Sequence, residues 1–306
     1  MRTALVIPSL GAPHLRHCLR GVAALDPAPE MKVLVLSDDA VEPEETGDLE
    51  IIHNRRRLGF AAAVNTGLTV VPAGIGAVAV LNDDAIPEPS WLGRLTSTLG
   101  ADPKLAAVQG TIADAAGERV DGRGIGFDRW GLPIQVDRAT PIGHDEGSRS
   151  IVAVSGTACL YRMEALRRSA LPGGEIFDPG FGCYHEDLDL GLRLARLGWS
   201  AGWIGGAPVR HLGSASGPVL RWRHPWWLLA NRWRALAGNL DRATLVLELP
   251  HLLRGEVRAV RTLLRHNPRA LPVEAAVALC LPFLAIGGWM RRTPGPRLTA
   301  IPGSPA

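Results

Sequence analysis

Short apolar runs alternate with amphipathic stretches through the first part of the chain. The runs lie at residues 3–8, 31–36, 50–53 and 77–81, and each is short enough to be one buried strand. The stretches between them have the length and spacing of helices. Strands that alternate with helices in this way predict an α/β fold with a mostly parallel sheet and right-handed crossovers.

The polar residues that follow the run at 77–81 are candidates for ligand binding. This strand is followed by Asn82, Asp83 and Asp84, and ligands bind at the carboxyl ends of strands in open α/β sheets. Acids there suit a divalent cation that is shared with substrate phosphates. An acidic turn without a ligand is the alternative. No glycine-rich dinucleotide or P-loop motif follows the first strand, which argues against those two kinds of site.

The segment 184–193 contains three acids among leucines and begins a predicted helix that runs to about Leu197. Asp187 lies one turn ahead of Leu190, so it should point towards the packed side of the helix. A carboxylate in this position can act as a general base, although acids also favour helix N-termini because of the macrodipole. The polar positions of the helix form a stripe that we expect to be solvated: Asp189, Arg193 and Arg196.

In the order and spacing of these motifs the chain resembles the family 2 glycosyltransferases from residue 3 to about 216. These are nucleotide-sugar-dependent inverting enzymes with a GT-A fold, and the rhamnosyl- and galactofuranosyl-transferase-like group is the most similar. The matching segments are, in chain order, 6–8, 54–67, 81–84, 155–162, 177–181, 184–190, 198–199 and 211–216. No single motif is specific by itself.

The resemblance implies roles for individual residues. Asp187 would be the catalytic base that deprotonates the acceptor hydroxyl. Asp84 and His211, the latter in a loop after a strand at 201–204, would hold Mg²⁺ or Mn²⁺. The donor, a nucleotide-diphosphate sugar, would contact Pro8, Ser9, Asp39, Gly59, Phe60, Asn65, Asn82, Asp83 and Asp84. Residues expected at the acceptor are Trp130, Gly156 and Glu186.

Two positions depart from the family pattern. Position 82 is Asn82 where a strict D-x-D motif has Asp, which weakens the metal site or leaves Asp84 to hold the cation alone. Ser37 separates the second strand from Asp38 and Asp39, so the expected contact from Asp39 to the nucleobase is less direct. A lone histidine such as that at position 211 is more often structural, and its place in the family's loop is what favours a metal ligand.

One base and one metal ion suffice for an in-line displacement that inverts the anomeric centre. The cation neutralises the leaving diphosphate and the base activates a sugar hydroxyl. Glu186 and Asp187 are neighbours on one helix and cannot flank a glycosidic bond, which disfavours hydrolysis. The competing hypothesis is a non-catalytic GT-A-fold protein that senses sugar nucleotides or acts as a scaffold. The combined presence of Asp84, Asp187 and His211 argues against it.

Length, net charge and cysteine content narrow the possible folds, partners and kinds of site further. A chain of 306 residues can hold one large α/β domain and a smaller appendage, and its net charge of +3 is too small to suggest nucleic acid as a partner. The four cysteines are scattered, so neither a disulfide framework nor a zinc site is expected. The first apolar run ends at Pro8 and does not predict a secretory signal.

The region 113–149 is rich in glycine and charge and predicts a long loop with weak strands. It lies between the metal motif and the base motif, so one hypothesis is acceptor recognition with Trp130 as a platform for a sugar ring. A flexible loop is the equally weighted alternative.

The composition changes after Pro218. Tryptophan and arginine interleave through 219–236, a second amphipathic stretch covers 243–265, and 273–290 is apolar but short of the roughly 20 residues that span a bilayer. We expect a catalytic domain at 1–216, a helical region at 217–292 and a disordered tail at 293–306. Such helices suit a membrane interface. Packing on the catalytic domain or in a homo-oligomer is the alternative.

These features lead to an expected place of action. The enzyme would be cytoplasmic and peripheral on the inner face of the plasma membrane. There it would act on a glycan or lipid-linked glycan acceptor in cell-surface polysaccharide assembly.

Overall fold

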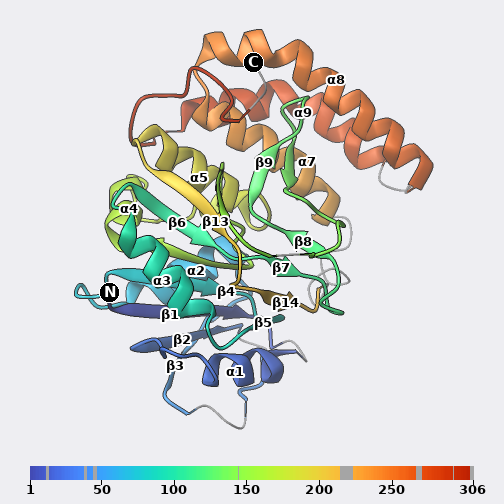
Figure 1. Cartoon of the computed structure of the whole chain (residues 1–306). Coiled ribbons are helices and arrows are strands. Elements are labelled where there is room, and N and C mark those ends of the chain that lie inside the picture. The colour runs from blue at the N-terminus through green and yellow to red at the C-terminus, as the bar shows by residue number, and fades with distance from the viewer. Residues whose placement is uncertain are drawn as a thin grey trace.

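The computed structural model describes residues 1–11, 14–37, 40–43, 47–143, 145–213, 223–266, 271–291 and 293–303. An eight-stranded sheet in the order β11-β13-β6-β12-β4-β1-β2-β3 forms its centre (Figure 1). Its strands are β1 (Thr3–Ser9), β2 (Met31–Leu36), β3 (Leu49–His53), β4 (Ala77–Leu81), β6 (Leu105–Gln109), β11 (Ser148–Ile151), β12 (Ala158–Arg162) and β13 (Ser200–Ile204).

Six of these eight strands run in one direction, and β11 and β12 run against them. The expected α/β fold with a mostly parallel sheet is therefore confirmed, as are the four strands predicted from the first apolar runs. Antiparallel β12 begins at the edge where its neighbour β4 ends, since Ala158 pairs with Leu81. This places the start of one strand beside the carboxyl ends of the parallel ones.

Helices cover both faces of the sheet. Successive residues of β1 alternate between them: Leu5 and Ile7 pack with α1 (Leu15–Ala23) and α3 (Trp91–Ala101). On the other face, Ala4 and Val6 pack with α2 (Phe60–Thr69), α4 (Met163–Ser169) and α5 (Glu186–Arg196). Because both faces are covered, the strands are continuous apolar runs and do not alternate with polar residues.

The glycine-rich region contributes to a second, four-stranded sheet in the order β5-β14-β7-β8. Its strands are β5 (Ala85–Pro87), β14 (Val209–His211), β7 (Ile112–Ala113) and β8 (Val120–Gly122). A hairpin of β9 (Ile125–Phe127) and β10 (Pro133–Gln135) lies next to it. The expected loop with weak strands is thus present. We expected His211 in a loop, but it is the last residue of strand β14.

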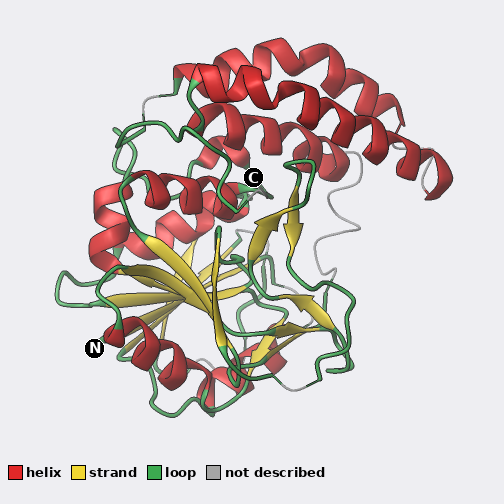
Figure 2. Cartoon of the chain, turned by 45° about the horizontal axis from the view of Figure 1, so that its top comes forward, coloured by secondary structure: helices red, strands yellow, loops and turns green. Residues whose placement is uncertain are grey.

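Three helices form a layer above α5: α7 (Arg223–Asn239), α8 (Arg242–His266) and α9 (Leu271–Met290) (Figure 2). Ala235 of α7 packs against Leu188 and Leu192 of α5. Val277 of α9 packs against α7. Within the described residues, no helix has both the length and the apolarity that crossing a membrane requires.

The stripe of α5 that we expected to be solvated is buried. Asp189 and Arg193 are fully buried and Arg196 is 7% exposed. The reason is that α5 packs on the sheet with one side and on α7 with the other. Asp189 Oδ2 lies 2.9 Å from Arg193 Nε and 3.0 Å from Arg291 Nη2, so the buried charge is paired.

The described part of the tail makes contacts with the rest of the chain. We expected disorder from residue 293, but 293–303 lie against α5 and the C-terminal helices. Arg297 Nη1 donates to the carbonyl oxygen of Ala237 at 2.7 Å, and Ile301 is 2% exposed. Arg196 in turn donates to the carbonyl oxygens of Gly295 and Pro296. These contacts attach residues 295–301 to α5 and α7.

Candidate active site

The ends of three strands meet at one edge of the central sheet. Ser9 ends β1, Asn82 follows β4, and Thr157 precedes β12. Asn82 N donates to the carbonyl oxygen of Thr157 at 2.8 Å, and Ser9 Oγ donates to Asp83 Oδ2 at 2.6 Å. The predicted donor residues Ser9, Asn82 and Asp83 are therefore brought together. Asp39, our candidate for the contact with the nucleobase of the donor, lies outside the described residues.

Asp84 and His211 lie side by side because β5 and β14 pair with each other. The pairing sets His211 opposite Ala85, and Leu212 N donates to the carbonyl oxygen of Asp84 at 2.8 Å. His211 Nε2 is 3.3 Å from Asp84 Oδ1. The two residues predicted to hold a metal are thus neighbours although 127 positions separate them in the sequence.

A third residue, Asp121 of β8, fixes the histidine ring. Its Oδ2 is 2.7 Å from His211 Nδ1, and the hydrogen bond to His211 lowers the pKa of Asp121. The ionised carboxylate accepts, so Nδ1 carries the proton and Nε2 faces Asp84. Burial alone would lower the pKa of His211, but hydrogen bonds to Asp121 and Asp84 and their charges raise it to about 9.

This group fits a divalent cation that is shared with a substrate. In the described part of the chain, no three His, Cys, Asp or Glu side chains form a preformed metal cage. Two neighbouring ligands of an octahedral ion lie roughly 3 Å apart, close to the 3.3 Å between Asp84 and His211. A carboxylate behind the imidazole is also typical of metal-bound histidine. The protein could supply these two ligands, and phosphate oxygens and water could supply the others.

The candidate base, Asp187, occupies the first turn of α5. Gly156 N donates to its Oδ2 at 3.1 Å and Leu188 N donates to its Oδ1 at 2.8 Å. Burial raises the pKa of Asp187, while these backbone hydrogen bonds oppose the rise. The result is a carboxylate that is oriented through both oxygens and is a stronger base than an exposed aspartate.

Glu186, the preceding residue, is in a different environment. It is 5% exposed, and its Oε2 has no hydrogen-bond partner among the residues that the structure describes. Burial and the charge of Asp187 raise its pKa well above the usual range. Within the pair, Glu186 therefore binds a proton more readily than Asp187, which its backbone hydrogen bonds favour in the charged form.

Tyr184 lies in the loop immediately before the helix of the candidate base. Its pKa is raised to about 12, first by burial and also by the charges of Glu186 and Asp84. Tyr184 has a φ of +70°, a left-handed conformation that is uncommon for a residue with a side chain.

Phe60 packs on Gly156, whose amide holds Asp187, and Gly59 packs on Gly182 in the loop before α5. A Cβ at Gly156 would lie 2.8 Å from the Phe60 ring, and a Cβ at Gly59 would lie 2.2 Å from the carbonyl oxygen of Gly182. Only glycine permits these approaches. The turn that we expected to line the donor site therefore supports the backbone that holds Asp187.

Other predicted residues lie in different surroundings. Pro8 is a buried residue of β1. Asn65 Nδ2 donates to the carbonyl oxygen of Phe177, and its Oδ1 accepts from two backbone amides, so its amide holds a loop in place. Trp130 lies in the contact between the β9–β10 hairpin and α8, where its ring is edge-on to His251 at 6.0 Å.

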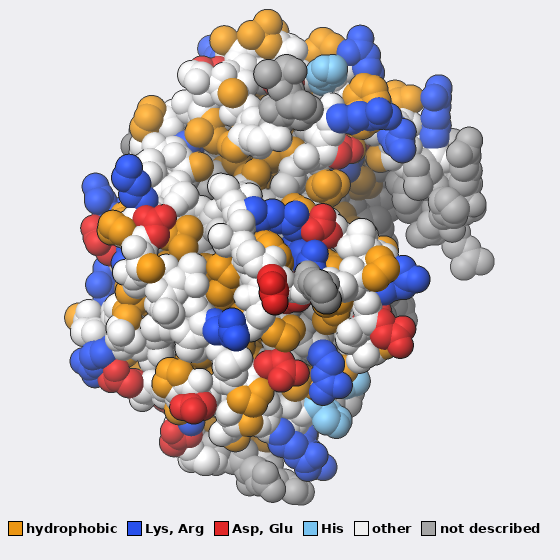
Figure 3. All heavy atoms as spheres, viewed as in Figure 1, with side chains coloured by type: hydrophobic (Ala, Val, Ile, Leu, Met, Phe, Trp, Pro, Cys, Tyr) orange, Lys and Arg blue, Asp and Glu red, His pale blue; other side chains and the backbone are white. Residues whose placement is uncertain are grey.

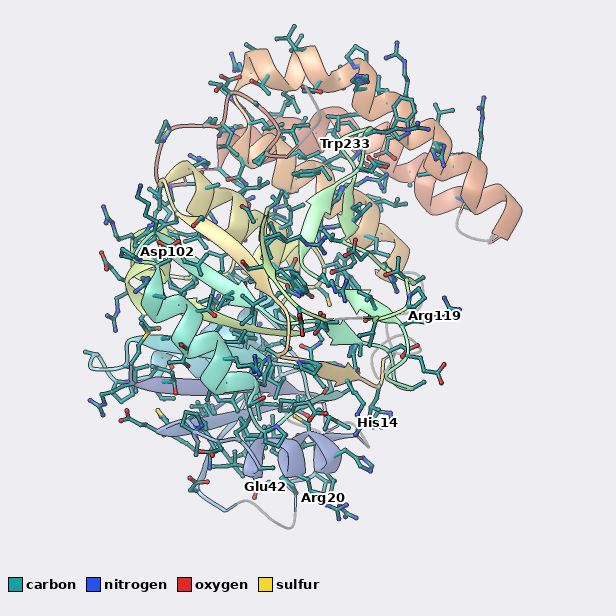
Figure 4. The ribbon with its side chains drawn as sticks, viewed as in Figure 1. His14, Arg20, Glu42, Asp102, Arg119 and Trp233 are labelled. Carbon is teal, nitrogen blue, oxygen red and sulfur yellow. The ribbon has the colours of Figure 1, made fainter. Side chains whose placement is uncertain are left out.

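Asp121 and Tyr184 had no role in the sequence-based prediction. Asp121 lies in a glycine-rich stretch whose strands are too short to be recognised, so its approach to His211 could not be anticipated. Arg119 lies at the outer end of the β7–β8 hairpin, and Trp233 lies among the C-terminal helices (Figure 4). For Tyr184, the only signal in the sequence was its position next to the acidic motif.

Comparison with known proteins gives one family and a set of similar folds. The sequence profile described as Glycosyl transferase family 2 matches residues 5–169. A structure of GalNAc-T7 with UDP, GalNAc and Mn²⁺ is similar with a TM-score of 0.59 and 16% identity, over 79% of this chain and 48% of that one. This chain thus spans about half the length of GalNAc-T7.

A second similar structure is the mannosyltransferase PcManGT from Pyrobaculum calidifontis in complex with GDP-Man and Mn²⁺. Its TM-score is 0.55 and its identity 19%, over 94% of this chain and 79% of that one. No curated protein matches in a sequence search. At these identities the two structures support the GT-A fold and do not identify a substrate.

Proposed function

We propose that this chain, which belongs to glycosyl transferase family 2, is an inverting enzyme that moves a hexosyl or deoxyhexosyl group. The donor would be a nucleotide-diphosphate sugar and the acceptor a hydroxyl of a glycan or lipid-linked glycan. The observation that carries this proposal is the Asp187 carboxylate, oriented by Gly156 N and Leu188 N and made more basic by burial. Rhamnosyl or galactofuranosyl transfer is the finer form of the proposal.

The reaction needs one proton transfer and one displacement. Asp187 takes the proton of the acceptor hydroxyl as its oxygen forms a bond to the anomeric carbon. The bond from that carbon to the diphosphate oxygen breaks on the opposite face, and the nucleoside diphosphate leaves with the electron pair. The configuration at the anomeric carbon is inverted because attack and departure occur on opposite faces.

Asp84 and His211 would bind Mn²⁺ or Mg²⁺, and Asp121 would hold the histidine ring. The cation would supply positive charge to the departing diphosphate. GalNAc-T7 was solved with UDP, GalNAc and Mn²⁺ and PcManGT with GDP-Man and Mn²⁺, which supports a divalent cation and a nucleotide-sugar donor here. Ser9 would keep Asp83 oriented towards the donor through its 2.6 Å hydrogen bond.

For the acceptor we propose a role for Glu186, Gly156 and Trp130. When protonated, the Glu186 carboxyl could donate to a sugar oxygen beside the base. Trp130 would contribute through the hairpin that packs on α8, which links the acceptor side to the C-terminal helices.

We also propose that the enzyme works on the cytoplasmic face of the plasma membrane, in cell-surface polysaccharide assembly. Nine of the twelve large hydrophobic side chains exposed in the described residues belong to α8 and α9. Arg254, Arg258 and Arg261 are exposed on α8. Figure 3 shows hydrophobic and basic side chains together at the top of the molecule, over these helices. This combination suits an anionic bilayer surface.

A donor screen tests the catalytic proposal. The full chain would be incubated with UDP-, GDP- and dTDP-sugars, including dTDP-rhamnose and UDP-galactofuranose, with and without Mn²⁺. We expect one nucleotide class to raise the melting temperature and to be hydrolysed slowly, in both cases only with metal. Binding without hydrolysis or transfer from any donor would indicate the alternative, a non-catalytic sensor or scaffold.

A further inference from the structure

The loop that leads into the base helix has an unusual backbone. Tyr184 and His185 have φ values of +70° and +66°, so two consecutive residues with side chains adopt the left-handed conformation immediately before α5. Such residues are held by their surroundings. The loop Phe181–His185 must therefore obtain its stability from contacts outside itself.

The helix α7 provides these contacts. Asn231, 5% exposed in the middle of α7, has its Nδ2 at 2.8, 2.9 and 3.0 Å from the carbonyl oxygens of Phe181, Cys183 and Tyr184. The two hydrogens of one amide nitrogen are thus shared among three carbonyl groups of the loop. One turn earlier, the carbonyl oxygen of Leu228 accepts from His185 Nε2 at 3.1 Å.

Close contacts bound the loop both at the start of α2 and at α7. The carbonyl oxygen of Gly182 would lie 2.2 Å from a Cβ at Gly59, and a Cβ at Gly182 would lie 3.1 Å from the Trp227 ring. The loop therefore lies between α7 on one side and the N-terminal end of α2 on the other. Gly59 adjoins Phe60, which packs on Gly156, the residue whose amide holds Asp187.

We propose that Asn231 is a positioning residue for glycosyl transfer. It holds the carbonyl groups of the loop so that Tyr184 and the first turn of α5 keep Asp187 in its catalytic orientation. The C-terminal helices then complete the active site and are more than a membrane attachment. This inference rests on the proposed role of Asp187 as the base.

The same helix offers a matched control. Asn239 is fully buried on α7, and among the described residues its Nδ2 donates to Asp189 Oδ1 at 2.9 Å and to the carbonyl oxygen of Ala235, and to none of the loop carbonyl groups; without it, Asp189 keeps its pairs with Arg193 and Arg291. Asn231→Ala and Asn239→Ala each remove one buried amide that joins α7 to the catalytic domain. Both variants should lose stability, so stability alone does not distinguish them.

The discriminating measurements are the turnover number, donor affinity and local hydrogen exchange. For the donor that the parent hydrolyses with Mn²⁺, we expect Asn231→Ala to lower kcat about tenfold or more, with its KM and the Kd of the matching nucleoside diphosphate unchanged. Amides 182–188 should exchange faster in this variant. Asn239→Ala should keep the parental kcat and the parental exchange of these amides.

Equal kcat and equal exchange in the two alanine variants would overturn the proposal. So would a fall in nucleoside diphosphate affinity with kcat unchanged, because the loop would then serve the donor. If Asn231→Ala does not fold, Asn231→Ser keeps one donor and should give intermediate values. A parent without hydrolysis or transfer would refute the proposed activity, while the exchange measurement would still decide whether Asn231 holds the loop.

Discussion

The neighbouring carboxyl groups of Glu186 and Asp187 differ in the hydrogen bonds that they receive from the backbone. Burial raises the pKa of both. Asp187 receives two backbone hydrogen bonds, which favour the charged form, whereas Oε2 of Glu186 has no partner among the described residues. A proton that binds to this pair therefore goes to Glu186 first.

This difference predicts opposite effects for two isosteric substitutions. Asp187→Asn should lower transfer or donor hydrolysis by at least about 100-fold, because the base is lost, with donor affinity nearly unchanged. Glu186→Gln should keep most of the activity, since Gln resembles the protonated acid. Steady-state kinetics and calorimetry of the same samples would test both. More than a few per cent of activity in Asp187→Asn would refute the assignment.

The histidine at the metal site allows a second prediction. Asp121→Asn should weaken Mn²⁺ binding about 10- to 100-fold, because the ring of His211 exchanges a charged acceptor for a neutral, weaker one and becomes a poorer ligand. Asp84→Ala and His211→Ala should weaken it more. Glu118→Gln, an exposed site on the same hairpin, removes an equal charge and should have no effect. Mn²⁺ titration followed by electron paramagnetic resonance measures all four variants, and equal affinities for Asp121→Asn and Glu118→Gln would contradict the role of Asp121.

The sequence predicted the site in part. Asp84, His211 and Asp187 could be named from motif order, and the structure brings Asp84 and His211 together. Their roles remain predictions. Asp121 could not be named, because its contact depends on the strand order of a sheet whose members are two or three residues long. Residues close in space but remote in sequence leave no periodic signal.

At the scale of elements, α5 differs most from its sequence-based interpretation. Its leucines follow two helical stripes, and the structure uses both: Leu190 and Leu194 face the sheet, while Leu188 and Leu192 face α7. The charged positions between the stripes are consequently buried. The sequence could not indicate this, because an isolated amphipathic helix has the same pattern as one with a second partner.

Arg291, after α9, neutralises buried charge on α5 and on the loop before it. Its guanidinium lies 3.0 Å from Asp189 and 2.9 Å from Asp178. Arg291→Met should therefore lower the free energy of unfolding by about 3 kcal/mol, the lower end for a broken buried pair, because Arg193 still pairs with Asp189. Urea denaturation measures this, with Arg254→Met on exposed α8 as the control. Equal midpoints for the two variants would show that the network contributes little.

His185 predicts how stability depends on pH. Burial, with a smaller effect of the charge of Arg232, lowers its pKa from 6.5 to about 4. Between these values the unfolded chain binds a proton that the folded chain does not. Stability should therefore fall as the pH drops from about 6.5 towards 4, with a slope approaching about 1.4 kcal/mol per pH unit from this residue. His185→Asn tolerates the left-handed backbone and should reduce that slope; an unchanged slope would exclude His185 as its source.

At the scale of the whole molecule, the C-terminal helices and the catalytic domain share buried surface. Leu188 and Leu192 would be uncovered without α7, and Asp189 would lose Arg291 and Asn239. A chain that ends near residue 216 would therefore expose apolar side chains of α5 and leave Asp189, among the described residues, paired with Arg193 alone. Surface substitutions are the appropriate way to separate membrane binding from catalysis.

Membrane binding can be tested on the exposed face of the last helices. Leu247 on α8 and Phe283 on α9 are 78% and 76% exposed, and Val41, in the loop after β2, is 84% exposed. The full chain should float with liposomes that contain anionic lipid at low salt, and less at high salt, because arginines contribute to the attraction. The double variant Leu247→Glu/Phe283→Glu should remain in the soluble fraction, since two carboxylates oppose insertion, while donor hydrolysis and the melting temperature stay at parental values.

Val41→Glu, the matched control, removes an equally exposed apolar side chain from a different part of the chain and should float like the parent. If the parent itself stays soluble at low salt, the membrane proposal is wrong. In that case a concentration-dependent dimer that the double variant abolishes would assign the face of α8 and α9 to contacts between copies of the chain. The apolar side chains would then be covered by protein, and the enzyme would need an acceptor that reaches it in solution.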